Sequence, residues 1–247
     1  MATALARGWG EPVLCSDSGS GRAQALAQEL GGEALSNVEV AERADLVVLC
    51  HKPGQLGQVA RQIRGHAKAV ASVVGVRPSE LWSAYQGDPT RPGTPCFYLM
   101  PNTPVAVRRG VICYVPARDV DSGLEAEVIA LFERLGRIVT IPEAQLEAAA
   151  AVMSVGPAYV ALLTEAQVDA AVRHGLPAPL AAQLVVETMA GTAELLTARD
   201  HDTLAVRREV TSPGGSTARG LAALERAGVR SAFDDAIDAV TQRSRAS

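Results

Sequence analysis

The sequence lacks an excess of basic residues, a long apolar run and a secretory leader. Its formal net charge at pH 7 is −4, and Lys and Arg are scattered along its 247 residues, so it carries no sign of nucleic-acid binding. The longest apolar stretch, residues 148–163, is interrupted by Ser154 and Gly156-Pro157 and is shorter than the ~20 residues that span a bilayer. A basic segment followed by an apolar one is missing after Met1. We therefore expect a cytoplasmic protein with neither a nucleic-acid nor a membrane partner.

Cysteine and histidine are also scarce and widely spaced. The four cysteines show no C-x-x-C spacing, and no two of the four histidines share the spacing of metal ligands. Each cysteine falls in or beside a predicted strand, where a free thiol behaves as a small hydrophobe. We therefore expect no metal site and no disulfide among Cys15, Cys50, Cys96 and Cys113.

Hydrophobic residues make up 48% of the chain and charged residues 20%, which is typical of a globular protein. Up to about residue 141, short β-rich runs alternate with helical patterns. Strands are predicted at residues 13–16, 46–50, 69–74 and 96–100, with edge strands at 111–115 and 137–141. Helices are predicted at residues 22–30, 38–44, 55–64, 78–85 and 121–135. This alternation predicts an α/β fold with a doubly wound sheet over residues 1–143.

Residues 144–247 read as an all-helical domain. Helices are predicted over residues 146–173 with a break at 156–157, and over 180–196, 216–226 and 231–243. The first two are apolar on nearly every side and need cover on every side. About 100 residues cannot easily surround two such helices, so a second copy of the chain is expected to cover them in a dimer.

Two loops of the first domain follow predicted strands and carry polar groups. A doubly wound sheet binds its ligand at the carboxyl ends of its strands. His51-Lys52-Pro53 would place an ammonium group near a pyrophosphate or a nicotinamide ribose, although a solvated turn is the simpler explanation of this loop taken alone. Pro101-Asn102-Thr103-Pro104 presents an amide and a hydroxyl between two rigid prolines, as a binding site or as a stiff connection.

Two segments of the helical domain are also unusual. Gly156-Pro157 interrupts a long helix, and a packing kink is its simplest explanation. In residues 211–217, Thr-Ser-Pro-Gly-Gly-Ser-Thr, two glycines precede the start of a helix. The free N–H groups of a helix N-terminus bind carboxylates, and Thr217 would add a hydroxyl beside them. Helix capping explains the Ser and Thr residues but not the Pro-Gly-Gly before them.

Taken in order, these four segments resemble the pyrroline-5-carboxylate reductase family, and the resemblance covers essentially the whole chain. Its strongest part is residues 211–217, followed by Gly220-Leu221 and Arg230-Ser231-Ala232. The family resemblance implies a Rossmann-type cofactor domain and a helical domain that interlocks with a partner subunit, often in a ring of dimers. It also implies hydride transfer from a reduced nicotinamide to the imine carbon of 1-pyrroline-5-carboxylate, which gives L-proline in the last step of proline biosynthesis.

The resemblance also implies a set of site residues. The substrate would be bound by Ser212, Gly214, Gly215, Ser216 and Thr217, with Thr217 as the donor to the imine nitrogen. The cofactor would be bound by Ser16, Asp17, Asn37, His51, Lys52, Pro53, Asn102 and Thr103. An acid such as Asp17 favours the 2′-hydroxyl of NADH, whereas neighbouring hydroxyls with Arg22 suit the 2′-phosphate of NADPH. The family commonly uses NADPH, which is therefore the expected cofactor, with NADH as the alternative.

The chain departs from the family pattern in two places. Residues 1–8 read as the helix that should follow a first strand and a Gly-x-Gly-x-x-Gly loop, so we expect the chain to lack both. A start codon assigned too late explains this most simply, and a real loss would favour a catalytically silent dimerising partner. Met153 and Val155 replace small polar residues before Gly156, which leaves open a related reductase of another cyclic imine or keto acid. His51 stands where the family more often has an aliphatic residue.

Overall fold

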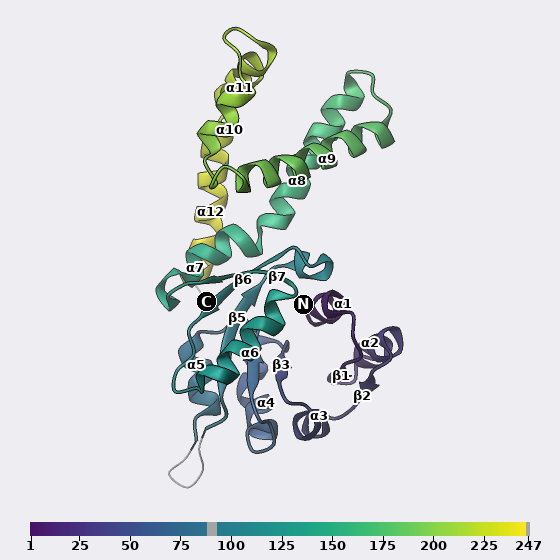
Figure 1. The fold of residues 1–247 in the computed structure, drawn as a ribbon, viewed down its shortest axis with the longest axis vertical. Coiled ribbons are helices and arrows are strands. Elements are labelled where there is room, and N and C mark those ends of the chain that lie inside the picture. Colours follow the sequence, from purple (N-terminus) through teal and green to yellow (C-terminus); the bar gives the residue numbers. More distant parts are fainter. Residues whose placement is uncertain (88–92, 246–247) are drawn as a thin grey trace. The chain divides into compact units, whose positions relative to one another are not determined.

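The computed structural model describes residues 1–87 and 93–245. The chain divides into two compact units, residues 1–157 and 158–247 (Figure 1). The first contains all the strands of the described chain, and the second is helical. The α/β class followed by a helical region is therefore confirmed, and the predicted domain boundary at residues 143/144 stays a prediction.

The first unit contains a five-stranded sheet in the order β3-β4-β5-β6-β7. Its strands are β3 (Val47–Leu49), β4 (Val70–Ser72), β5 (Cys96–Pro101), β6 (Gly110–Val115) and β7 (Gly136–Thr140). Neighbours are parallel except β5 and β6, which are antiparallel. The prediction that residues 111–115 form an edge strand is wrong, because β6 pairs with β5 on one side and β7 on the other.

A second, two-stranded sheet lies before the first along the chain (Figure 1). Its parallel strands are β1 (Leu14–Cys15) and β2 (Glu33–Ala34). Among the described residues no strand joins this pair to β3, so the doubly wound sheet is divided into two. The sequence pattern did not predict β2, because a Glu-Ala pair carries no β signal.

Helices cover both faces of the five-stranded sheet, as a parallel sheet requires. Alternate residues of β5 point to opposite faces: Tyr98 packs with α4 (Leu56–Ile63) and α5 (Pro78–Tyr85), whereas Phe97 packs with α1 (Ala2–Trp9) and α6 (Ser122–Glu133). Helices α2 (Arg22–Leu30) and α3 (Asn37–Arg43) accompany the two-stranded sheet (Figure 1). After β7, the chain continues through η3 (Glu143–Gln145), α7 (Leu146–Ala149) and the π-helical segment η4 (Ala150–Ser154).

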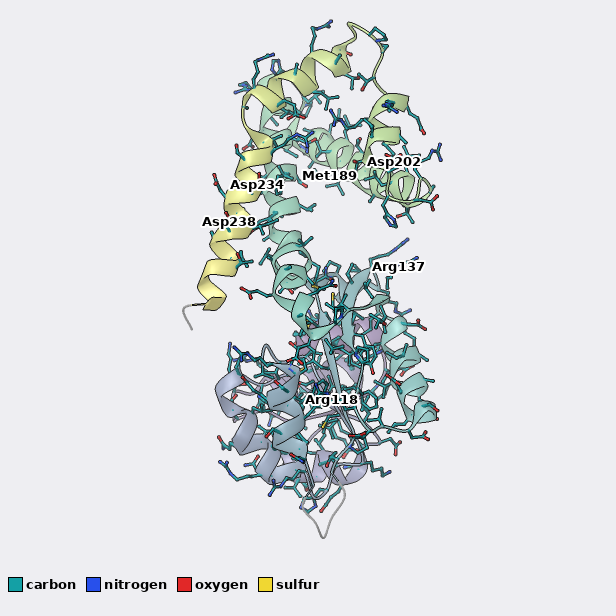
Figure 2. The ribbon with its side chains drawn as sticks, turned by 90° about the vertical axis from the view of Figure 1, so that its left-hand side faces the viewer. Arg118, Arg137, Met189, Asp202, Asp234 and Asp238 are labelled. Carbon is teal, nitrogen blue, oxygen red and sulfur yellow. The ribbon has the colours of Figure 1, made fainter. Side chains whose placement is uncertain are left out.

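The second unit consists of helices that bury almost no residues among themselves. They are α8 (which begins at Gly156 and ends at Arg173), α9 (Ala178–Thr197), α10 (Thr203–Glu209), α11 (Ser216–Arg226) and α12 (Val229–Arg245). The Thr164 hydroxyl of α8 contacts the Met189 sulfur of α9 at 3.0 Å (Figure 2), and the rings of Tyr159 and Phe233 join α8 to α12 with centroids 6.4 Å apart. Among residues 158–241 only Ala181 and Val206 are buried.

Apolar side chains of this unit are exposed in the single chain. Leu162 and Val186 expose 64% and 52% of their surface, on α8 and α9. Among the described residues, one helical run, Glu143–Arg173, is long and apolar enough to cross a membrane by length and composition, with a mean hydropathy of 1.6. This run extends beyond the apolar stretch recognised in the sequence. The apolar faces therefore need cover that the single chain does not supply.

Candidate cofactor and substrate sites

A groove of about 1390 Å³ runs through the first unit. Residues of β1 and β3 line it, together with the residues that follow these strands and the start of α1. Five of the eight predicted cofactor residues line this groove: Ser16, Asp17, Asn37, His51 and Lys52. The groove thus collects side chains that lie up to 36 positions apart in the sequence at the carboxyl ends of parallel strands, where a doubly wound fold binds its ligand.

His51 brings an unsatisfied acceptor to this groove. Its Nδ1 lies 2.9 Å from the carbonyl oxygen of Lys52, and because a carbonyl only accepts, Nδ1 carries the hydrogen. Nε2 is then an acceptor, and it is buried without a hydrogen-bond partner among the described residues. Buried polar atoms are nearly always paired, so this atom calls for a donor from outside the chain. The hydroxyl and amide groups of a nicotinamide dinucleotide supply such donors, so the residues present fit that cofactor.

The carboxylate of Asp17 is hydrogen-bonded within the turn between β1 and α2. Its Oδ1 accepts from the N–H groups of Gly19 and Ser20 at 2.7 and 3.1 Å. Its Oδ2 accepts from the N–H of Ala23 at 2.9 Å and from the Ser20 hydroxyl at 2.8 Å. The Ala23 N–H and the Ser20 hydroxyl contribute most to lowering the pKa of Asp17 to about 2, so the carboxylate is ionised at every physiological pH.

Asn37 occupies the first position of α3, behind a capping box made by Ser36 and Glu39. Its Nδ2 donates to Gln62 Oε1 at 2.7 Å, which fixes the side chain across from α4. Asn37 therefore lies in the groove with its side chain held in one orientation.

The remaining three predicted cofactor residues, Pro53, Asn102 and Thr103, do not line the groove. Pro53 begins the 3-10 turn η1 (Pro53–Gln55), and Thr103 begins η2 (Thr103–Val107). Asn102 is 8% exposed, and both of its amide atoms are used within the protein. Its Oδ1 accepts from Val111 N at 2.9 Å, and its Nδ2 donates to the Met153 carbonyl at 3.1 Å. The amide thus ties the start of β6 to η4, a role that the Pro-Asn-Thr-Pro pattern did not indicate.

We expect Asn102→Ala to destabilise the protein by about 1–3 kcal/mol, because it leaves Val111 N–H and the Met153 carbonyl without partners. Chemical denaturation measures the loss. Thr103→Ala is the matched control, since the neighbouring Thr103 side chain is exposed and forms no side-chain hydrogen bond among the described residues, so its loss should be smaller. Equal stability of the alanine variant and the wild type would contradict this structural role.

A second candidate site surrounds the start of α11 in the helical unit. Gly214 has φ 68°, a left-handed conformation that favours glycine, and Gly215 N donates to Ser212 O at 3.0 Å. This turn delivers the chain to Ser216, where the helix begins with no side-chain cap. The first N–H groups of a helix have no partner within it, so those of Ser216 and Thr217 are available to an anion.

Thr217 is half-buried in the first turn of this helix, and its hydroxyl has no hydrogen-bond partner within residues 1–87 and 93–245. Arg219, which the sequence pattern did not single out, donates from Nη1 to the Gly214 carbonyl at 2.9 Å and so holds the turn. The segment therefore offers backbone donors for a carboxylate and a free hydroxyl one residue into the helix. These are the groups required by a small carboxylic acid that also carries a basic nitrogen.

Comparisons with known proteins identify the families that this chain resembles. Residues 143–247 match the family described as pyrroline-5-carboxylate reductase dimerisation, and residues 1–76 match the family described as NADP oxidoreductase, coenzyme F420-dependent. A pyrroline-5-carboxylate reductase of Mycobacterium tuberculosis is 36% identical over 90% of this chain and 83% of its own length. One from a Synechocystis strain is 34% identical over 85% and 77%. A pyrroline carboxylate reductase of Plasmodium falciparum, solved with NADP bound, superposes with a TM-score of 0.83 at 28% identity, over 99% of this chain and 93% of its own.

Proposed function

Because this chain belongs to the pyrroline-5-carboxylate reductase family, we propose that Ser212, Gly214, Gly215, Ser216 and Thr217 bind its substrate. The protein is an oxidoreductase that reduces 1-pyrroline-5-carboxylate to L-proline, the last step of proline biosynthesis, with NADPH. The observation that carries the assignment of the substrate residues is the uncapped start of α11 beside the free hydroxyl of Thr217.

The chemistry of the reaction suits this segment. The substrate is a five-membered ring with a carboxylate and an imine, and the carboxylate needs fixed N–H donors. The N–H groups of Ser216 and Thr217 supply them, and Gly214 and Gly215 allow the turn that presents them. The imine nitrogen becomes an amine during reduction, so it needs a hydrogen-bond or proton donor, which is the role proposed for the Thr217 hydroxyl.

The cofactor belongs in the groove of the first unit in this proposal. When bound there, NADPH supplies the hydride that reduces the imine carbon. Ser16, Asn37, His51 and Lys52 hold it, with Asp17 in the turn that follows β1. We propose residues 1–143 as the cofactor domain and residues 144–247 as the dimerisation and substrate domain. We propose the cytoplasm as the location of the protein.

The direct test is oxidation of NADPH by the purified protein with 1-pyrroline-5-carboxylate, followed by identification of L-proline as the product. The six-membered analogue of the substrate and the open-chain keto acid serve as comparison substrates, because Met153 and Val155 replace residues that are usually small and polar. Consumption of NADPH without proline formation would contradict the proposed role.

The dimerisation domain supports self-association, and we propose that exposed residues of α8 and α9 form the interface between two copies. Their exposed side chains include Val160, Leu162, Leu184 and Val186. Burial against the equivalent faces of a second copy would cover them without a membrane, and an obligate interface of this kind buries upwards of ~2,000 Å². A ring of such dimers is the larger assembly proposed.

We expect the protein at micromolar concentration to have a mass that is an even multiple of 25.7 kDa, measured by light scattering. Leu162→Glu, which places a charge on the proposed interface, should shift the mass toward the monomer, because burying an unpaired charge is strongly unfavourable. Val107→Glu is the matched control, since Val107 is equally apolar and 71% exposed but lies in the first unit. A monomeric wild type would contradict the proposed interface.

A further inference from the structure

The turn between β1 and α2 contains an acid whose role the sequence alone does not reveal. In dinucleotide-binding sheets an acid near this position usually accepts hydrogen bonds from the ribose hydroxyls and so favours NADH. Asp17 follows β1 by two residues and lines the groove, which places it where that role would be performed. An NADPH-dependent enzyme with an acid here presents an apparent contradiction, because the 2′-phosphate is itself an anion.

The hydrogen bonds of Asp17 resolve this contradiction. A carboxylate has about four lone-pair sites. Asp17 accepts four hydrogen bonds from its own turn: from the N–H groups of Gly19, Ser20 and Ala23 and from the Ser20 hydroxyl, at 2.7–3.1 Å. No acceptor site is left for the ribose. The donors also surround the charge on the side of the turn, which reduces its repulsion of an anion in the groove.

The same turn presents a cation to the groove. Arg22 is the first residue of α2 and lines the groove, and among the described residues it forms no ion pair with an acid. Gly19 and Gly21 have φ 88° and 77°, so the turn adopts left-handed conformations that cost little energy only at glycine. A chain with two glycines in six residues is flexible on its own, and the four hydrogen bonds to Asp17 hold it in one conformation.

We propose that Asp17 is a positioning residue for NADPH: it contacts no part of the cofactor and instead fixes the turn Ser18–Gly21 so that Arg22 and the Ser18 hydroxyl receive the 2′-phosphate. The inference rests on the proposed placement of the cofactor in this groove. An acid that binds the ribose favours NADH, whereas Asp17 in this role favours NADPH.

The test is the affinity of Asp17→Asn for NADPH, NADH and 2′,5′-ADP, measured by calorimetry on the full-length protein. Asparagine keeps one acceptor oxygen and loses the bonds to Oδ2, so the turn loosens. We expect NADPH and 2′,5′-ADP to bind on the order of tenfold more weakly, because a displaced group loses much of its interaction. NADH should be nearly unaffected, since it has no 2′-phosphate. Hydrogen exchange at the amides of Gly19, Ser20 and Ala23 should become faster.

Glu29→Gln is the control for charge alone. Glu29 lies in the same helix, α2, pairs with Arg7 and does not line the groove, so its removal should not weaken NADPH binding. Ser20→Ala, which removes one of the four hydrogen bonds, should weaken NADPH binding in the same way as Asp17→Asn but less strongly. If the Asp17→Asn protein does not fold, Ser20→Ala is the variant used for the test.

Tighter or unchanged NADPH binding by Asp17→Asn would overturn the inference, and tighter binding would show that Asp17 repels the phosphate directly. An equal loss for NADPH and NADH would also overturn it, as general damage to the fold. A wild-type protein that binds neither NADPH nor 2′,5′-ADP would overturn the placement of the cofactor as well. A wild type that binds both but forms no proline would contradict the proposed function and leave the role of Asp17 standing.

Discussion

Replacing Thr217 with alanine is expected to lower kcat/KM for 1-pyrroline-5-carboxylate by ~10²-fold, the typical loss when one oriented donor to a developing charge is removed. The hydroxyl stands in the first turn of α11 and is not hydrogen-bonded within the described chain, so it is free to serve the substrate. NADPH affinity should change little, because Thr217 is not among the residues of the cofactor groove. Steady-state kinetics together with cofactor titration measure both effects.

Two matched variants separate the hydroxyl from the backbone at this position. Thr217→Ser keeps the hydroxyl and should retain most of the activity, whereas Thr217→Val keeps the branched shape and should be as impaired as the alanine variant. Ser216→Ala removes the neighbouring hydroxyl, which is exposed, and should have a smaller effect. Wild-type rates in Thr217→Ala would rule out this hydroxyl as the donor to the imine nitrogen.

Elements with strong local signals were predicted accurately from the sequence. The predicted residues 22–30, 78–85 and 216–226 coincide with α2, α5 and α11 as observed. Gly31 ends α2 in a left-handed conformation, and Pro78 occupies the first position of α5. Residue types that favour helix ends therefore make these boundaries predictable from the local sequence. The short helix α10 was missed, although Asp202 caps its first N–H groups (Figure 2), because seven residues give too short a pattern to recognise.

The pairing of strands was less predictable, because it depends on residues far apart in the sequence. The run 111–115 looks like any half-buried strand, and only its register against both β5 and β7 makes it interior to the sheet. The division into two sheets also depends on pairing between distant residues. The sequence predicts β1 and β3 individually, but among the described residues no strand lies between them to join the two sheets.

For the candidate sites, the rule that ligands bind at strand ends selected five residues that line the groove. It did not predict what each side chain does. Asp17 and Asn102 have the polarity of ligand-binding residues, yet their atoms are paired within the chain. A residue type shows which bonds a side chain can make, and only the folded backbone determines whether a ligand or the protein makes them.

The second large effect is expected from Gly215→Val, which should raise KM for 1-pyrroline-5-carboxylate about ten- to a hundredfold, with a smaller change in kcat. A β-carbon at Gly215 would lie 2.4 Å from Ser212 Oγ and 3.1 Å from the Ser212 carbonyl oxygen. The Ser212 hydroxyl can rotate away, but the carbonyl, which accepts the Gly215 N–H at 3.0 Å, must yield by a few tenths of an ångström, and this shift loosens the turn. Loosening it displaces the N–H groups of Ser216 and Thr217, and one hydrogen bond to a charged group contributes about 1.5–3 kcal/mol.

The split between KM and kcat distinguishes this variant from Thr217→Ala, since a carboxylate is bound equally in the ground state and the transition state. Gly220→Val is the matched control: Gly220 lies in the same helix, and a β-carbon there meets no atom within 4 Å. Its KM should stay near the wild-type value, even though valine in a helix costs some stability. An unaltered KM in Gly215→Val would move the carboxylate site away from the start of α11, because the crowding at Ser212 acts on the turn that presents the N–H donors.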